Sequence, residues 1–157
     1  MWRTLSGEPV PSMIQAVRGL VKDCDRTIHV GTDSKQSGPF TDFVTAVVVL
    51  EPGRGGRAFY TKLRVPRMNA LAQRLIHETQ LSIEVAERVD RELPQTVVMH
   101  IDANLKREHR SSAYAKMLAG IGMGYGFKVM LKPDAWCATS VADYVVRGKA
   151  EKSFEAA

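Results

Sequence analysis

Between residues 26 and 150 the hydrophobic pattern changes near residue 66, from consecutive strand-like runs to helices that alternate with strands, and that change constrains the fold more than any other feature. The runs before it are short, and they are rich in β-branched residues or alternate between apolar and polar ones, which is typical of β-strands. Short loops with glycine and proline separate these runs, so we expect three consecutive antiparallel strands. The three runs are residues 26–34, 40–50 and 57–65.

After residue 66 the apolar residues follow a helical spacing, and helices alternate with strands. Each later strand is preceded by a helix, which predicts parallel pairing through right-handed crossovers. The chain as a whole predicts an α/β fold with a mixed five-stranded sheet, its first three strands antiparallel, and helices on both faces. The expected helices are 67–92, 108–124 and 138–149, and the expected strands are 96–103 and 127–133.

A helix is also expected at residues 11–22, in front of the first strand. We therefore divide the chain into an N-terminal helical extension (residues 1–25), a main domain (residues 26–150) and a frayed tail (residues 151–157). A chain of 157 residues, with 45% hydrophobic and 25% charged residues, suits one globular domain with a core of its own.

The net charge of +5, from 22 Lys and Arg against 17 Asp and Glu, favours an anionic partner, and nucleic acid is the commonest one. No apolar run approaches the ~20 residues of a membrane span, and the first 25 residues carry no signal-peptide pattern. The two cysteines, Cys24 and Cys137, are far apart and outside any metal-binding pattern, which suits a reducing cytoplasm. Oligomeric state is not readable from the sequence.

Acidic residues stand where predicted strands end. Asp33 ends the first strand of the sheet and Asp102 ends the fourth. If these strands are parallel neighbours, the two carboxylates lie side by side at one edge. Glu78 in the first long helix and Asp143 in the last helix can lean over the same edge. A turn or cap role for each aspartate, and a solvated position for Glu78, are the alternatives.

Clustered carboxylates raise one another's pKa unless cations compensate their charge. Hard cations with oxygen ligands do so, and Mg²⁺ or Mn²⁺ is the natural choice. Two such ions ~3.5–4 Å apart can activate a water and stabilise the leaving oxygen in phosphodiester hydrolysis. Asp134, after the fifth strand, competes with Asp143 as a ligand or adds to it.

Basic residues follow the predicted metal site along the chain. Those after Asp102 could hold a phosphate backbone or could simply be a solvated helix start. Trp136 could stack on a base or pack in the core. The predicted nucleic-acid contacts are Lys35, Lys106, Arg107, Arg110 and Lys132.

Three motifs carry a family resemblance: "GTDSK" at 31–35, "HIDAN" at 100–104 and "KPDAWCATSVAD" at 132–143. With the element order, they resemble the ribonuclease H-like superfamily and, more narrowly, the bacterial YkuK-type ribonuclease H-like proteins, over roughly residues 25–148. The resemblance implies that four acids hold the catalytic ions: Asp33, Glu78, Asp102 and Asp143. Ribonuclease H proper carries a histidine loop before its last helix, whereas this chain has Lys132, Pro133 and Asp134 there.

Two functions follow from these observations. The first is a metal-dependent nuclease or phosphodiesterase that hydrolyses nucleic acid with two metal ions and no protein nucleophile. The second is a catalytically inactive nucleic-acid-binding module of the same fold, which would show salt-dependent binding without metal-dependent turnover.

Overall fold

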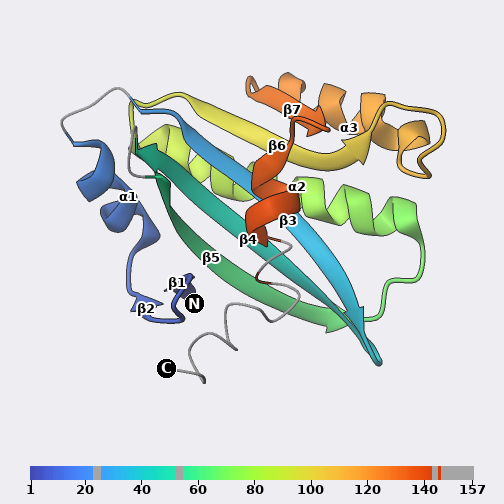
Figure 1. Cartoon of the computed structure of the whole chain (residues 1–157), viewed down its shortest axis with the longest axis horizontal. Helices are drawn as coiled ribbons and strands as arrows, with labels where there is room; N and C mark the ends of the chain where they lie inside the picture. The colour runs from blue at the N-terminus through green and yellow to red at the C-terminus, as the bar shows by residue number, and fades with distance from the viewer. Residues whose placement is uncertain (23–25, 52–54, 143–144, 146–157) are drawn as a thin grey trace.

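Three long strands form the centre of the sheet. In the computed structural model, which describes residues 1–22, 26–51, 55–142 and 145, these strands are β3 (Ile28–Ser37), β4 (Phe40–Glu51) and β5 (Gly55–Pro66) (Figure 1). They pair antiparallel, and the turn from β3 to β4 holds Gly38 at φ +56°, a conformation that glycine adopts without strain. The predicted antiparallel series is confirmed.

Two further strands extend the sheet on the other side of β3. β6 (Val97–Asn104) pairs parallel with β3, and β7 (Lys128–Lys132) pairs parallel with β6. The helices α2 (Leu71–Glu92) and α3 (Ser112–Gly124) make the two crossovers. The predicted parallel pairing, and the adjacency of the first and fourth expected strands, are therefore confirmed.

The N-terminal segment adds strands that the sequence analysis missed. β1 (Trp2–Thr4) pairs with β5, β2 (Pro9–Val10) pairs with β1, and the sheet order is β2-β1-β5-β4-β3-β6-β7. The prediction of five strands was wrong, because the sheet has seven strands within the residues that the structure describes. Strands of three and two residues are too short to show a hydrophobic period, and backbone pairing at the edge of β5 holds them. The expected helix follows as α1 (Met13–Val21), capped by Ser12.

Helices cover both faces of the sheet, as predicted. On one face, α1 and α2 pack over Val30, Val47 and Met99, and α3 joins α2 over Ile101. On the other face lies a π-helical segment, η1 (Cys137–Ala142), which packs over Val44 and Val48 of β4. The remainder of the expected last helix and the expected tail lie outside the described residues. Within the described residues, no helix combines the length and apolar character needed to span a membrane.

Candidate active site

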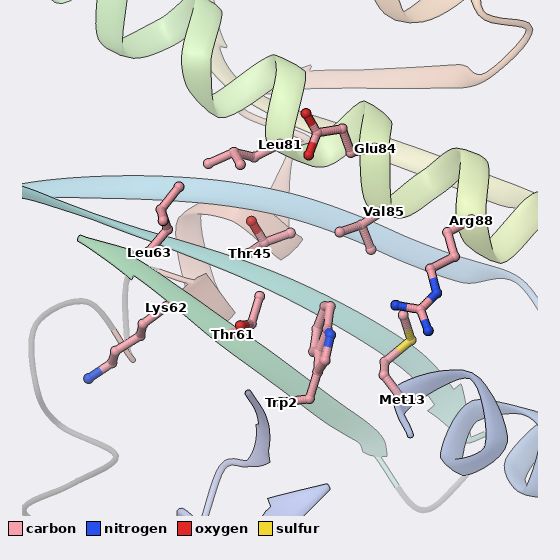
Figure 2. Close-up of a pocket in the computed structure, with 10 residues that line it drawn as sticks. All are labelled: Trp2, Met13, Thr45, Thr61, Lys62, Leu63, Leu81, Glu84, Val85 and Arg88. Atoms are coloured by element: carbon pink, nitrogen blue, oxygen red, sulfur yellow. The ribbon is translucent and has the colours of Figure 1, made fainter. Parts of the chain in front are cut away.

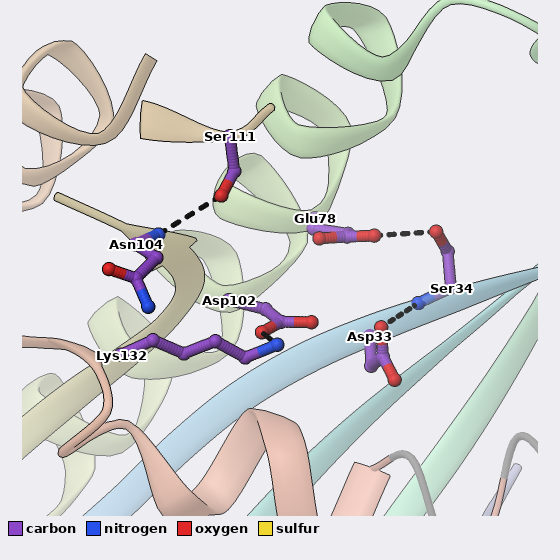
Figure 3. A network of polar contacts seen from close by, with 7 residues as sticks. All are labelled: Asp33, Ser34, Glu78, Asp102, Asn104, Ser111 and Lys132. Carbon is purple, nitrogen blue, oxygen red and sulfur yellow. Dashed lines mark hydrogen bonds and ion pairs between the residues drawn. The ribbon is translucent and has the colours of Figure 1, made fainter. Parts of the chain in front are cut away.

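The parallel pairing of β3 with β6 ends just before two acidic residues. The last paired residues are Gly31 and His100, and Asp33 and Asp102 each lie two positions beyond them (Figure 3). Asp33 does not end its strand, as the sequence had suggested, because β3 continues to Ser37 in its hairpin with β4. It lies instead where β3 loses its parallel neighbour, so the two carboxylates still come to the same edge.

The regular pairing of β6 with β7 is interrupted at Asp102. The register between β6 and β7 shifts between Ile101 and Asn104, where pairing with β7 is interrupted. Such irregularities re-aim side chains and are frequent beside active sites. Asp102 carries 18% side-chain exposure and forms an ion pair with Nζ of Lys132, the residue that pairs with Asn104.

Hydroxyl groups align α2 with β3. Thr32 Oγ1 lies 2.7 Å from Ser82 Oγ on α2 and 3.0 Å from Thr45 Oγ1 on β4. Ser34 lies two residues after Thr32 on β3, and Glu78 lies one turn before Ser82 on α2. Ser34 Oγ donates a hydrogen bond of 2.5 Å to Glu78 Oε1. This alignment brings Glu78 to the edge that carries the two aspartates (Figure 3).

The environment of Glu78 disfavours its negative charge. The side chain is buried, with 7% exposure. Burial and, after it, the nearby charges of Asp33 and Asp102 raise its pKa, whereas the Ser34 hydrogen bond and Arg74 lower it, and the net pKa is about 8. Three predicted site residues thus influence one another electrostatically, although they come from two strands and a helix.

The predicted metal ligands are only partly brought together. Within the part of the chain that the structure describes, no group of three His, Cys, Asp or Glu side chains lies close enough to hold a metal ion. Asp134 is exposed in the turn after β7, where its backbone N–H donates to Leu131 O at 2.8 Å. Asp143, the fourth predicted ligand, lies outside the described residues.

The predicted phosphate contacts lie in two places beside the acids. Lys35 is exposed on β3, two residues beyond Asp33. Lys106, Arg107 and Arg110 are exposed in the loop between β6 and α3. Asn104 shapes this loop, because its Oδ1 accepts from Lys106 N at 2.9 Å and its N–H donates to Ser111 Oγ at 3.0 Å. The remaining predicted phosphate contact, Lys132, forms an ion pair with Asp102.

Sequence reasoning missed Ser34 as a member of the site. It follows Asp33 directly, so its side chain points to the opposite face of β3 and reaches Glu78, while its N–H lies 2.8 Å from Asp33 Oδ1. The alternation of a strand through "TDS" is the signal that could have found it. The pairing of Lys132 with Asp102 had no such signal, because it depends on the register between β6 and β7.

A separate hollow between α2 and β5 does not contain these acids (Figure 2). Its volume is about 370 Å³, and Trp2, Leu63 and Leu81 give it apolar walls. Glu84 is the single carboxylate among its described lining residues, beside the cations Lys62 and Arg88. A lone carboxylate flanked by cations does not match a divalent-cation site.

The match to a protein family agrees with this topology. The model of the Ribonuclease H-like family matches residues 10–147, which is most of the chain. The chain belongs to the ribonuclease H-like family. Among solved structures, RNase H1 from the halophilic archaeon Halobacterium salinarum NRC-1 aligns at 15% identity and a TM-score of 0.43, covering 78% of this chain and 98% of that one. No curated protein matches the sequence.

Proposed function

We propose that this ribonuclease H-like chain is a Mg²⁺- or Mn²⁺-dependent phosphodiester hydrolase that acts on nucleic acid. The observation that carries the proposal is that Asp33 and Asp102 follow the last paired residues of β3 and β6 and that both act electrostatically on the buried Glu78. The family match supports the assignment to nucleic-acid chemistry. Within this family we further propose the YkuK-type group, on the motifs around Asp33 and Asp102, and a cytoplasmic setting.

The chemistry of the donor set fits divalent cations. Glu78 is a buried acid near two others, and burial first, then the charges of Asp33 and Asp102, raise its pKa, so its ionised form would be stabilised by added positive charge. Lys132 already supplies one positive charge, to Asp102. We propose Asp33, Glu78, Asp102 and Asp143 as the ligands, with Asp134 as the alternative to Asp143. Bound ions would neutralise the phosphate, activate a water and stabilise the leaving oxygen.

The side chains around the acids have separate roles in this proposal. Ser34 orients the Glu78 carboxyl through its hydrogen bond. Lys132 pairs with Asp102, and its ammonium group would be available to a substrate phosphate if ions took its place at that carboxylate. The exposed loop with Lys106, Arg107 and Arg110 contacts the phosphate backbone on either side of the cut.

A cleavage assay with matched variants tests the proposal. Labelled single-stranded, duplex, RNA/DNA hybrid and branched substrates are incubated with Mg²⁺, with Mn²⁺ or with EDTA. We expect metal-dependent cleavage of at least one substrate, and a loss of about a hundredfold or more in Asp33→Asn and Asp102→Asn, because each removes a ligand worth several kcal/mol. Asp90→Asn, an exposed aspartate on α2, is the control. Unchanged cleavage in both site variants would rule out this mechanism.

The alternative, a non-catalytic nucleic-acid-binding module, also has a specific observation in its favour. One carboxylate oxygen of Asp102 is paired with Lys132, and one of Glu78 accepts from Ser34, so protein groups already satisfy part of the proposed ligand set. Salt-dependent binding of the same substrates, without cleavage in either metal, would favour this module over the hydrolase.

A further inference from the structure

A second cavity opens on the sheet face that bears Asp33 and Asp102, where β3, β6 and β7 begin. Its volume is about 430 Å³, which is within the range of small-molecule sites. Val98 and Met130 contribute apolar surface, and the side chains of His29, His100 and Trp136 line it. His100 lies two residues before Asp102 on β6, so the cavity begins roughly 7 Å along the strand from the candidate active site.

The aromatic residues of this cavity hold one another in place. The indole of Trp136 packs against both imidazoles, with ring centroids 4.6 Å from His29 and 4.8 Å from His100. His29 Nδ1 lies 3.0 Å from His100 Nε2, and the N–H of Cys137 donates to His100 Nδ1 at 3.4 Å. Hydrogen bonds therefore hold both ring nitrogens of His100 and Nδ1 of His29.

These hydrogen bonds assign the tautomers of the pair. Because His100 Nδ1 accepts from Cys137, a neutral His100 carries its proton on Nε2 and donates it to His29 Nδ1. A neutral His29 then carries its proton on Nε2, which is a donor for a ligand. Burial lowers the pKa of His29, and Lys128 lowers it further, so this ring is neutral at pH 7.

Cations flank the aromatic rings. Lys128 is exposed at the start of β7, and Arg26, before β3, is half-buried and donates from Nη1 to Leu20 O at 3.2 Å. No acidic side chain occurs among the described residues that line the cavity. A flat aromatic wall with neutral donors and a cationic rim suits a ligand that has a flat, polar-edged ring and a negative charge.

We propose that this cavity binds one nucleotide unit, with its base against Trp136 and its phosphate at Lys128 and Arg26. Base–aromatic stacking tolerates every base, so the site selects nucleotides as a class. The unit is either a free nucleotide or an unpaired nucleotide of a strand that crosses the acidic edge. Binding needs neither the metal ions nor hydrolysis, and it is therefore measured in EDTA, independently of the proposed catalytic function.

The indole N–H signal of Trp136 reports occupancy directly. The chain has two tryptophans, so Trp2→Phe leaves Trp136 as the single indole resonance in an NMR spectrum. Titration with a nucleoside monophosphate should shift this resonance saturably. Inorganic phosphate and the bare nucleoside should each bind at least about tenfold more weakly, because the first has no base to stack on Trp136 and the second has no phosphate. Equal binding of inorganic phosphate would overturn the proposal, since it would show that the base contributes nothing to binding.

A matched pair of lysine variants locates the phosphate. Lys128→Gln removes an exposed rim charge without touching the packed rings, and should weaken binding about threefold or more. Lys116→Gln removes an equally exposed lysine from α3 and should change nothing. Trp136→Leu removes the reporter resonance, so its binding is measured by isothermal titration calorimetry beside the wild type. It should be weaker by about fivefold or more, with folding checked by the retained melting transition. Equal affinities in the wild type and Lys128→Gln would overturn the assignment of this cavity.

Two further titrations in EDTA distinguish a free nucleotide from an unpaired nucleotide within a strand. A single-stranded pentanucleotide and a blunt duplex are compared with the monophosphate on the same Trp136 resonance. A strand site predicts that the single strand binds at least as tightly as the monophosphate and that the blunt duplex leaves the resonance unchanged. A free-nucleotide site predicts that the monophosphate alone shifts it. Absence of a saturable shift with all three ligands would contradict the proposal.

Discussion

At the scale of single residues, Glu78 connects the fold to the proposed chemistry. Its burial follows from the alignment of α2 on β3, which the hydroxyls of Thr32 and Ser82 maintain. A carboxyl group held there beside Asp33 and Asp102 favours its protonated form unless a cation is added. The residue therefore gives the folded protein a pH dependence that metal ions should remove.

We expect the contribution of Glu78 to the stability of the metal-free protein to fall as pH rises from about 4.5 to 8. In this window the unfolded chain releases the Glu78 proton and the folded chain retains it, so this part of the free energy of unfolding falls with pH. Glu78→Gln lacks this proton, and its stability relative to wild type should rise by about 2–4 kcal/mol between pH 5 and pH 8. Urea unfolding in EDTA measures this difference. A constant difference across that range would contradict the assigned environment of Glu78.

Sequence reasoning singled out Asp33 and Asp102, which remain predicted site residues, but not the side chains that contact the predicted site. Asp33 and Asp102 were found because they follow apolar strand residues, a local pattern that one sequence displays. Ser34 and Lys132 act through the alignment of α2 on β3 and the register of β6 with β7. Those alignments depend on packing across the sheet, which has no local signal in the sequence.

At the scale of elements, the packing of α3 on the sheet depends on Gly122. A Cβ added at this residue would come within 2.7 Å of Val129 Cγ2 on β7 and 3.6 Å of Met99 Sδ on β6. The same helix contains Gly120, where an added Cβ would meet nothing within 4 Å. These two glycines test whether α3 lies against β7 in solution as described.

We expect Gly122→Ala to destabilise the fold by roughly 1–3 kcal/mol, because the added methyl displaces Val129. Gly120→Ala should instead stabilise it by roughly 0.5–1 kcal/mol through helix propensity. Urea unfolding of the two variants and the wild type gives both values. Equal stability of the two variants would contradict this packing of α3 on β7.

Element order was predictable from the sequence, whereas strand number was not. The change of hydrophobic period near residue 66 separates the meander from the crossovers, and the structure has that division between β5 and α2. β1 and β2 were not predicted because backbone pairing, of β1 with β5 and of β2 with β1, holds them in place without an apolar face of their own. The predicted start of the first long helix was also wrong, since α2 begins at Leu71 instead of residue 67.

At the scale of the whole molecule, the net charge of +5 assists approach to a polyanion without selecting a sequence. The loop between β6 and α3 concentrates part of this charge beside the acids. Contacts to phosphates release counterions from nucleic acid, so each contact contributes to the salt dependence of binding.

We expect the triple variant Lys106→Gln, Arg107→Gln, Arg110→Gln to bind nucleic acid more weakly at low salt than the wild type. Its slope of log affinity against log salt should be smaller by roughly 2–3, because each lost phosphate contact removes about 0.7–0.9. Fluorescence anisotropy at several salt concentrations in EDTA measures the slope. Lys116→Gln, on the outer surface of α3, is the control. A slope equal to that of the wild type would place the nucleic-acid contacts elsewhere.

The measurement that tests the central claim most directly is Mn²⁺ binding followed by electron paramagnetic resonance at pH 7.5. The account predicts saturable binding to the wild type, and affinity at least about tenfold weaker in Asp33→Asn and in Asp102→Asn. Glu84→Gln, an exposed glutamate on the same helix as Glu78, should bind like the wild type. Wild-type affinity in both aspartate variants, or no binding by the wild type, would contradict the claim that this edge of the sheet holds catalytic metal ions.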